Sequence, residues 1–125
     1  MAATFGKFFS IILLLLLLAK SSFQQCSLDN ITISQVKKPG QVVEGKPEYL
    51  VIVNNNCICT QSNLQLNCTG FKTVVKVDPS ILSIDGNSCL FNNGRPFYGF
   101  TSKNFTYAWD TPSSFTPSSS YVSCS

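Results

Sequence analysis

Residues 45–68 read GKPEYLVIVNNNCICTQSNLQLNC, and this stretch decides the fold class. Residues 49–53 are a run of aromatic, aliphatic and β-branched side chains of the kind that strands favour. Residues 64–66 alternate apolar and polar side chains, as a strand does when one of its faces is buried. Cysteines lie between the two runs and directly after the second. The stretch therefore predicts two strands within a disulfide-stabilised domain.

Similar short runs recur outside this stretch, at residues 31–34, 74–77, 105–109 and 121–123. Clusters rich in Gly, Pro, Asn and Asp, which favour turns, separate many of the runs. Their intervals of roughly 8–12 residues are typical of antiparallel sandwiches and barrels. We therefore predict an all-β fold, a single antiparallel β-sandwich. The turn clusters are Lys38-Pro39-Gly40, Gly45-Lys46-Pro47, Asp78-Pro79-Ser80, Asp85-Gly86-Asn87 and Asn92-Asn93-Gly94.

Two segments allow more local predictions. Asp85-Gly86 and Asn93-Gly94 suit tight turns with positive φ, so we expect one or two hairpins between residues 81 and 97. Residues 111–120 are rich in Ser, Thr and Pro. We expect an irregular loop there.

The cysteines predict three disulfides, because an even number in a small exported chain indicates a disulfide framework. The sequence leaves fifteen pairings open. Residues two apart on an extended strand project from the same face, so Cys57 and Cys59 are expected to bond to different partners. A zinc site is not expected, since zinc ligands are often His and the chain has none. The six residues are Cys26, Cys57, Cys59, Cys68, Cys89 and Cys124.

The N-terminal segment predicts export. Lys7 precedes an apolar run at residues 8–19, and Ser21 supplies a small residue for cleavage. A membrane anchor is the alternative, but about 12 apolar residues are fewer than the ~20 that span a bilayer. We therefore expect a signal peptide at residues 1–21 and a cysteine-rich β-sandwich domain at residues 22–125. The mature product would be secreted from the cell, with no membrane attachment after cleavage.

The mature domain is nearly neutral. Of the nine Lys and Arg residues, Lys7 and Lys20 leave with the signal peptide, so seven remain against six acidic residues. This balance gives no strong attraction to nucleic acid or anionic membranes. The chain also has no glycine pattern that would cradle a phosphate. We expect neither a nucleic-acid partner nor a cofactor.

Catalytic side chains are scarce. Without His, neither a Ser-His-Asp nor a Cys-His arrangement can form. Two carboxylates could act as a glycosidase pair, yet Asp78 and Asp85 lie in turn sequences, and Glu44 and Glu48 flank Lys46 in a loop. We therefore expect no enzymatic activity, no catalytic residue and no metal ligand.

Three sequons are candidate N-glycosylation sites, which is consistent with export. They are Asn30-Ile31-Thr32, Asn67-Cys68-Thr69 and Asn104-Phe105-Thr106. Asn67 directly precedes a cysteine that we expect to be bonded.

Aromatic residues are concentrated in the C-terminal half of the chain. Such rings fill the core of small β domains, but exposed rings could form a platform for a sugar or a protein. An aromatic cluster around Tyr98 and Trp109 would suit a non-catalytic cell-wall or carbohydrate-binding module with cell-wall glycans as ligands. That function is the alternative to the one considered next. The aromatic residues are Phe97, Tyr98, Phe100, Phe105, Tyr107 and Trp109.

Several motifs together resemble one protein family. The most specific are Cys-Leu-x-Asn-x-Gly-x-Pro at residues 89–96 and Phe-x-Tyr-Ala at residues 105–108. Others are ITISQ at 31–35, GKPEY at 45–49, LNCTGF at 66–71 and VDP at 77–79. From Cys26 to Cys124 the chain resembles the tapetum-determinant family of small secreted cysteine-rich plant proteins.

This resemblance implies a secreted, β-sandwich-like signalling protein of the plant apoplast. The best-understood family member is the ligand of a leucine-rich-repeat receptor kinase that directs tapetal cell fate in the anther. By resemblance, the expected partner of this chain is the ectodomain of such a kinase, in cell-fate or developmental signalling. A ligand of this kind needs no active site, and the sequence names no receptor-contact residue.

Overall fold

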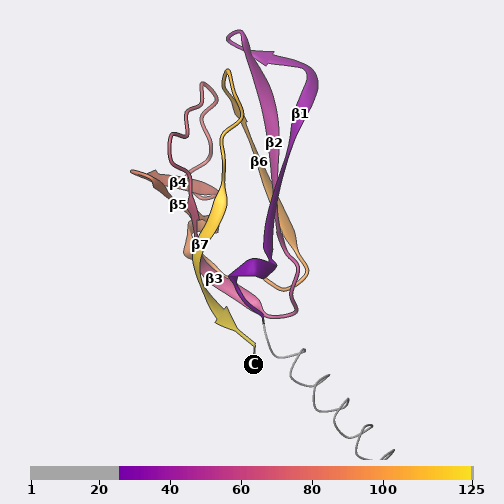
Figure 1. Cartoon of the computed structure of the whole chain (residues 1–125), viewed down its shortest axis with the longest axis vertical. Coiled ribbons are helices and arrows are strands. Elements are labelled where there is room, and N and C mark those ends of the chain that lie inside the picture. The colour runs from indigo at the N-terminus through magenta and orange to yellow at the C-terminus, as the bar shows by residue number, and fades with distance from the viewer. Residues whose placement is uncertain (1–25, 125) are drawn as a thin grey trace, which may run out of the picture.

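The computed structural model describes residues 26–124, which form two antiparallel β-sheets in two layers (Figure 1). The all-β sandwich is therefore confirmed. The predicted signal peptide lies outside the described residues. The first sheet has the order β1-β2-β6, with β1 at Ile31–Val43, β2 at Lys46–Asn55 and β6 at Ser102–Ala108. The second has the order β4-β5-β3-β7, with β3 at Thr60–Asn67, β4 at Leu82–Asp85, β5 at Ser88–Phe91 and β7 at Thr116–Ser123.

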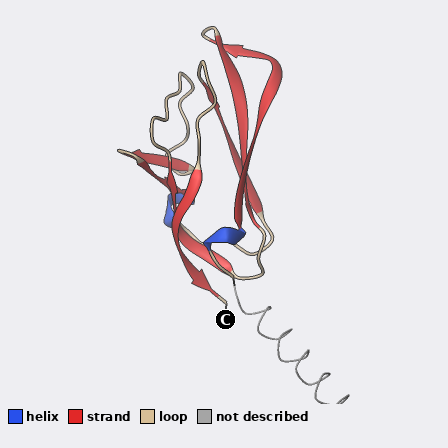
Figure 2. Cartoon of the chain, viewed as in Figure 1, coloured by secondary structure: helices blue, strands red, loops and turns tan. Residues whose placement is uncertain are grey.

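Helical structure in residues 26–124 consists of two short 3₁₀ segments, Leu28–Asn30 and Asn92–Gly94 (Figure 2). Within this part of the chain, no helix is long and apolar enough to cross a membrane.

Strand β2 illustrates how the sequence builds the core. Its alternate residues Tyr49, Val51 and Val53 are buried, while the residues between them are only partly buried. The register pairs Val51 with Phe105 and Tyr49 with Tyr107, so neighbouring strands place large side chains on the same inner face. These residues join Leu64, Leu66, Phe91 and others from the second sheet in one cluster between the layers.

Two hairpins follow local turn chemistry. Glu44 and Gly45 both have positive φ, at 50° and 76°, and they connect β1 to β2. Consecutive positive φ values match the right-handed twist of the flanking strands. A second hairpin joins β4 to β5 next to Gly86, which has a φ of 61°. The hairpin expected between residues 81 and 97 is thus confirmed at Asp85-Gly86, whereas Asn93-Gly94 lies in the 3₁₀ segment.

The strand expected at residues 74–77 does not form. The N–H of Val74 donates to the carbonyl of Ala108, but the N–H of Ala108 donates to the side-chain hydroxyl of Thr73. This side-chain acceptor replaces the backbone partner that a ladder would require. The segment therefore packs beside β6 without extending the sheet.

The prediction of a loop throughout residues 111–120 is also wrong, because β7 begins at Thr116. Asn67 pairs with Thr116, and Leu66 pairs with Pro117. A proline is tolerated there because β7 is an edge strand. The polar composition that indicated a loop instead reflects a half-exposed strand.

The structure selects one disulfide pairing from the fifteen that the sequence allowed. Cys26 bonds to Cys57, Cys59 to Cys124 and Cys68 to Cys89. Cys57 and Cys59 thus bond to different partners, as their spacing predicted. Cys68 and Cys89 are buried in the core, 1% and 0% exposed.

We expect the stability of the protein to fall in alkaline solution because of Tyr107. Its ring is buried, its hydroxyl donates to Gln35, and the N–H of Ser113 donates to its oxygen at 2.7 Å. Burial raises the pKa of Tyr107 above its ordinary value of 10.0. An unfolded tyrosine therefore loses its proton at a lower pH than the folded one, and the stabilisation present below about pH 10 disappears as the pH rises through the folded pKa.

Urea unfolding of the wild type and Tyr107→Phe at pH 7 and pH 10.5 checks this expectation. The variant should lose about 1–2 kcal/mol at pH 7, because its partners remain unpaired. It should lose less than the wild type between the two pH values. Equal losses in both proteins would show that another group causes the alkaline effect.

Candidate functional site

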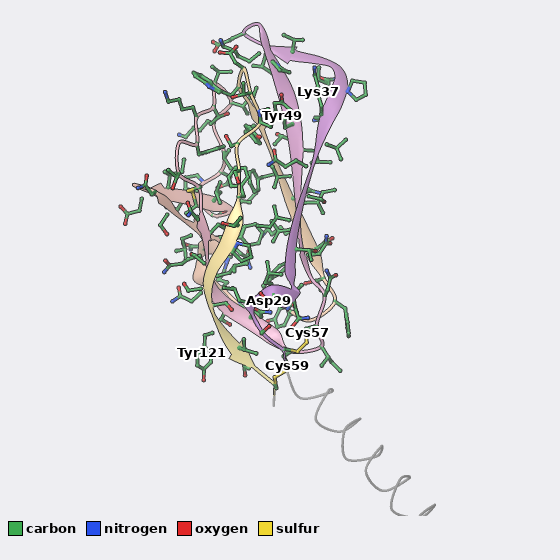
Figure 3. The ribbon with its side chains drawn as sticks, viewed as in Figure 1. Asp29, Lys37, Tyr49, Cys57, Cys59 and Tyr121 are labelled. Carbon is green, nitrogen blue, oxygen red and sulfur yellow. A yellow bond between two sulfur atoms is a disulfide. The ribbon has the colours of Figure 1, made fainter. Side chains whose placement is uncertain are left out.

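Two loops at one end of the sandwich expose three large apolar side chains. Ile58 is 65% exposed, Tyr98 63% and Phe100 71%. Ile58 lies in the turn between β2 and β3, and the other two lie just before β6. Cys57 and Cys59, which flank Ile58, mark this end in Figure 3. We call Ile58, Tyr98 and Phe100 the end patch, since exposed apolar side chains that gather together mark interaction sites.

The two loops that carry the end patch pack directly against each other. The N–H of Phe100 donates to the carbonyl of Cys57 at 3.2 Å. Gly99 lies so close to the opposite loop that an added Cβ would clash with the carbonyl oxygen of Ile58. Glycine is required here by a close approach of two backbones. The three residues of the end patch therefore lie on two loops whose backbones are in contact.

A buried amide, Asn55, organises this junction. Asn55 is 1% exposed, and its side-chain nitrogen donates to the carbonyls of Cys59 at 2.9 Å and Phe97 at 3.1 Å. Its side-chain oxygen accepts the N–H of Cys57 at 3.2 Å. One side chain thus satisfies backbone groups of both loops, which would otherwise be costly to bury.

The sequence reasoning missed Asn55 because it lies in a run of three asparagines, which is typical of a turn. A signal was nevertheless present. The inward positions of β2 are 49, 51 and 53, and continuing the same alternation places residue 55 on the inner face.

Disulfides and backbone geometry further fix the end patch. Cys26–Cys57 and Cys59–Cys124 hold the turn on both sides of Ile58. Phe100 has a φ of 56°, which is uncommon for a bulky residue. Such conformations persist where the surroundings enforce them, and they cluster at functional sites. The disulfides and the local backbone contacts therefore constrain the loops that carry the end patch.

The aromatic cluster expected around Tyr98 and Trp109 does not form. Tyr98 precedes β6 and Trp109 follows it, so the seven-residue strand separates them by roughly 20 Å. Trp109 is partly buried, and the ammonium groups of Lys46 and Lys72 lie 5.2 and 5.9 Å from its ring centroid. Of the remaining aromatics, Phe97, Phe105 and Tyr107 are buried and Phe100 is exposed. The six rings therefore provide no common platform.

The candidate glycosylation sites occupy three different environments. Asn30 is partly buried, and its side-chain oxygen accepts the N–H of Ser27 at 2.8 Å. Asn67 is exposed and accepts hydrogen bonds from the N–H and hydroxyl of Thr69. Asn104 is exposed on β6 and pairs in register with Ile52. All three remain candidates.

Three acidic side chains are each engaged with a separate partner. Glu48 pairs with Lys38 at 3.0 Å, and Asp110 pairs with Lys46 at 2.8 Å. Asp78 accepts the N–H of Ser80 at 2.9 Å, and hydrogen bonding by Ser80 lowers the pKa of Asp78. The expectation that Glu48 lies in a loop is wrong, because it belongs to β2. The partners of Glu48 and Asp78 agree with structural roles for these two acids.

A known protein family matches this chain. A family model described as Tapetum determinant 1, C-terminal, matches residues 27–125. The resemblance stated from the sequence is thereby confirmed, and the matched range contains the whole end patch. No curated protein and no solved structure matches the chain.

Proposed function

The chain belongs to the tapetum determinant 1 family, and from this premise we propose that it is a secreted signalling protein recognised by a plant leucine-rich-repeat receptor kinase. The receptor ectodomain would contact the end patch, and the signal would act in cell fate or development. We choose this surface because Ile58, Tyr98 and Phe100 are exposed on two loops that contact each other. As a ligand, the protein would need no enzymatic activity.

The chemistry of the end patch suits a protein partner. Tyrosine is enriched among the residues that dominate binding energy, and such residues lie in contacts that exclude water. The disulfides beside Ile58 hold its loop in place, which lowers the entropy lost on binding. Since the mature domain is nearly neutral, apolar burial rather than charge attraction would supply most of the affinity.

The disulfides also support the proposed export. All six cysteines are paired, and disulfides form and persist in oxidising compartments. Export through a signal peptide at residues 1–21 is part of the proposal. Its direct check is the N-terminal peptide of the secreted protein, which should begin at Ser22.

We expect Tyr98→Ala and Phe100→Ala each to weaken receptor binding by about 30-fold or more, the loss typical of a central aromatic contact. Purified mature protein would first be screened against a panel of leucine-rich-repeat ectodomains by surface plasmon resonance. The variants would then be titrated against the ectodomain that binds.

Two other exposed apolar residues, away from the end patch, serve as controls. Val42 is 63% exposed near the β1–β2 turn, and Ile84 is 52% exposed on β4. Val42→Ala and Ile84→Ala should keep wild-type affinity. Unchanged binding by the end-patch variants would place the contact elsewhere, and saturable binding to none of the ectodomains would remove the receptor proposal.

The carbohydrate-binding alternative has less support. It relied on Tyr98 and Trp109 acting together, and these residues lie at opposite ends of β6. Tyr98 and Phe100 are exposed, so stacking on a sugar ring at the end patch is the form of this alternative to test. Binding on a cell-wall glycan array that Tyr98→Ala abolishes would favour it over the receptor.

A further inference from the structure

Four of the six cysteines meet at the end of the sandwich that carries the end patch. The sulfur atoms of Cys26, Cys57 and Cys59 all lie within 4.8 Å of one another. They nevertheless belong to two different disulfides, Cys26–Cys57 and Cys59–Cys124. Two disulfides therefore lie close enough for a sulfur of one to approach the other after a small movement.

The four cysteines differ in accessibility. Cys59 is 4% exposed, whereas its partner Cys124 is exposed and follows the last strand. A thiolate from solvent would therefore attack the sulfur of Cys124 and release the buried Cys59. From this geometry we propose that the four residues form a thiol–disulfide exchange site whose substrate is an extracellular thiol of the glutathione class.

The exchange proceeds in two balanced steps. The external thiolate bonds to the sulfur of Cys124, the Cys59–Cys124 bond breaks, and Cys59 leaves as a thiolate. The Cys59 thiolate then bonds to the sulfur of Cys26, the Cys26–Cys57 bond breaks, and Cys57 leaves as a thiolate that takes a proton from water. Each step exchanges one disulfide for another, so no oxidant is consumed.

Two features favour the second step. A thiolate buried at Cys59 is poorly solvated. The sulfur atoms of the neighbouring Cys26–Cys57 disulfide lie within 4.8 Å of the Cys59 sulfur, so the thiolate can react with them. Attack on Cys26 is favoured over attack on Cys57, because a Cys57–Cys59 bond would close a strained ring across a single intervening residue. The product carries a Cys26–Cys59 bond, and Cys124 is bonded to the external thiol instead of to Cys59.

The variant Cys124→Ser tests the second step alone, because it leaves Cys59 without its partner beside an intact Cys26–Cys57 bond. Thiols would be blocked with N-ethylmaleimide in denaturing acid, and disulfide-linked peptides identified by fragmentation mass spectrometry. We expect the Cys26–Cys59 isomer, with Cys57 blocked, in about one tenth of the molecules or more. A single species with Cys26–Cys57 intact and Cys59 blocked would overturn the proposal.

The third disulfide supplies a matched control. Cys68–Cys89 contributes no sulfur to the cluster, so Cys89→Ser should leave Cys68 blocked in a single species. If that variant does not fold, the wild type treated with glutathione gives the same comparison. There we expect glutathione on Cys124, a blocked Cys57 and an unchanged Cys68–Cys89 bond.

An adduct on Cys124 with Cys59 blocked and Cys26–Cys57 intact would contradict the exchange, as would the lack of any adduct. These experiments measure disulfides without a receptor. Their outcome is therefore independent of the proposed signalling function.

Discussion

Gly99→Ala should destabilise the protein by about 3 kcal/mol, the upper range for forcing extra atoms into a packed site. The added Cβ would clash with the carbonyl oxygen of Ile58 and lie 2.8 Å from that of Cys57. Both are backbone atoms, which cannot rotate away as the end of a side chain could. The two loops must separate, and the hydrogen bond from Phe100 to Cys57 would be stretched or lost.

Gly86→Ala is the matched control for this substitution. A Cβ at Gly86 meets nothing within 4 Å, although φ is +61°. Its cost should be that of the left-handed backbone alone, about 1 kcal/mol. Urea unfolding followed by circular dichroism measures both variants. Equal losses would show that the loops adjust freely to each other, and the end patch would then not be a fixed surface.

Removing the Cys68–Cys89 disulfide with a double alanine variant should cost about 3 kcal/mol from chain entropy, given the sequence separation of 21 residues. A further loss comes from the small cavities left by two fully buried sulfur atoms. The disulfide connects the end of β3 to β5 in the second sheet. Its loss therefore loosens the sheet that carries Leu64, Leu66 and Phe91.

Thermal unfolding measures this second effect. We expect the melting temperature to fall by about 12 °C or more for a domain of this size. Ile84→Ala, an exposed change on the neighbouring strand β4, should stay within about 0.5 kcal/mol of the wild type. If the double alanine variant had the same melting temperature as the wild type, β-sheet pairing alone would be enough to hold β3 to β5.

Strand prediction succeeded where local pattern and tertiary environment agree. The run at residues 49–53 became the centre of β2, because apolar side chains there suit a strand between two neighbours. It failed where the two disagree. Residues 74–77 are apolar enough for a strand, yet the hydroxyl of Thr73 accepts the hydrogen bond from the backbone N–H of Ala108 in β6. The composition of residues 116–120 is typical of a loop, but these residues form β-sheet hydrogen bonds with β3.

The candidate site was predictable only in part. Tyr98 and Phe100 stand out as aromatic residues, and two cysteines mark the turn around Ile58. No local pattern shows that Asn55 bridges both loops, or that Gly99 contacts the backbone at Ile58. The contacts of Asn55 with Phe97 and of Gly99 with Ile58 join segments about forty residues apart, so they depend on how the two sheets are placed.

The sequence by itself determined the fold class, the use of cysteines and the family, because alternation, turn residues and cysteine count are local properties of the chain. The tertiary structure alone decided which cysteines pair, which aromatic rings reach solvent and which residues form the end patch. The physical reason is distance. Disulfide bonding and burial depend on atoms that only the packing of two sheets brings together, and Tyr98 and Trp109, eleven residues apart, are separated by the extended strand between them.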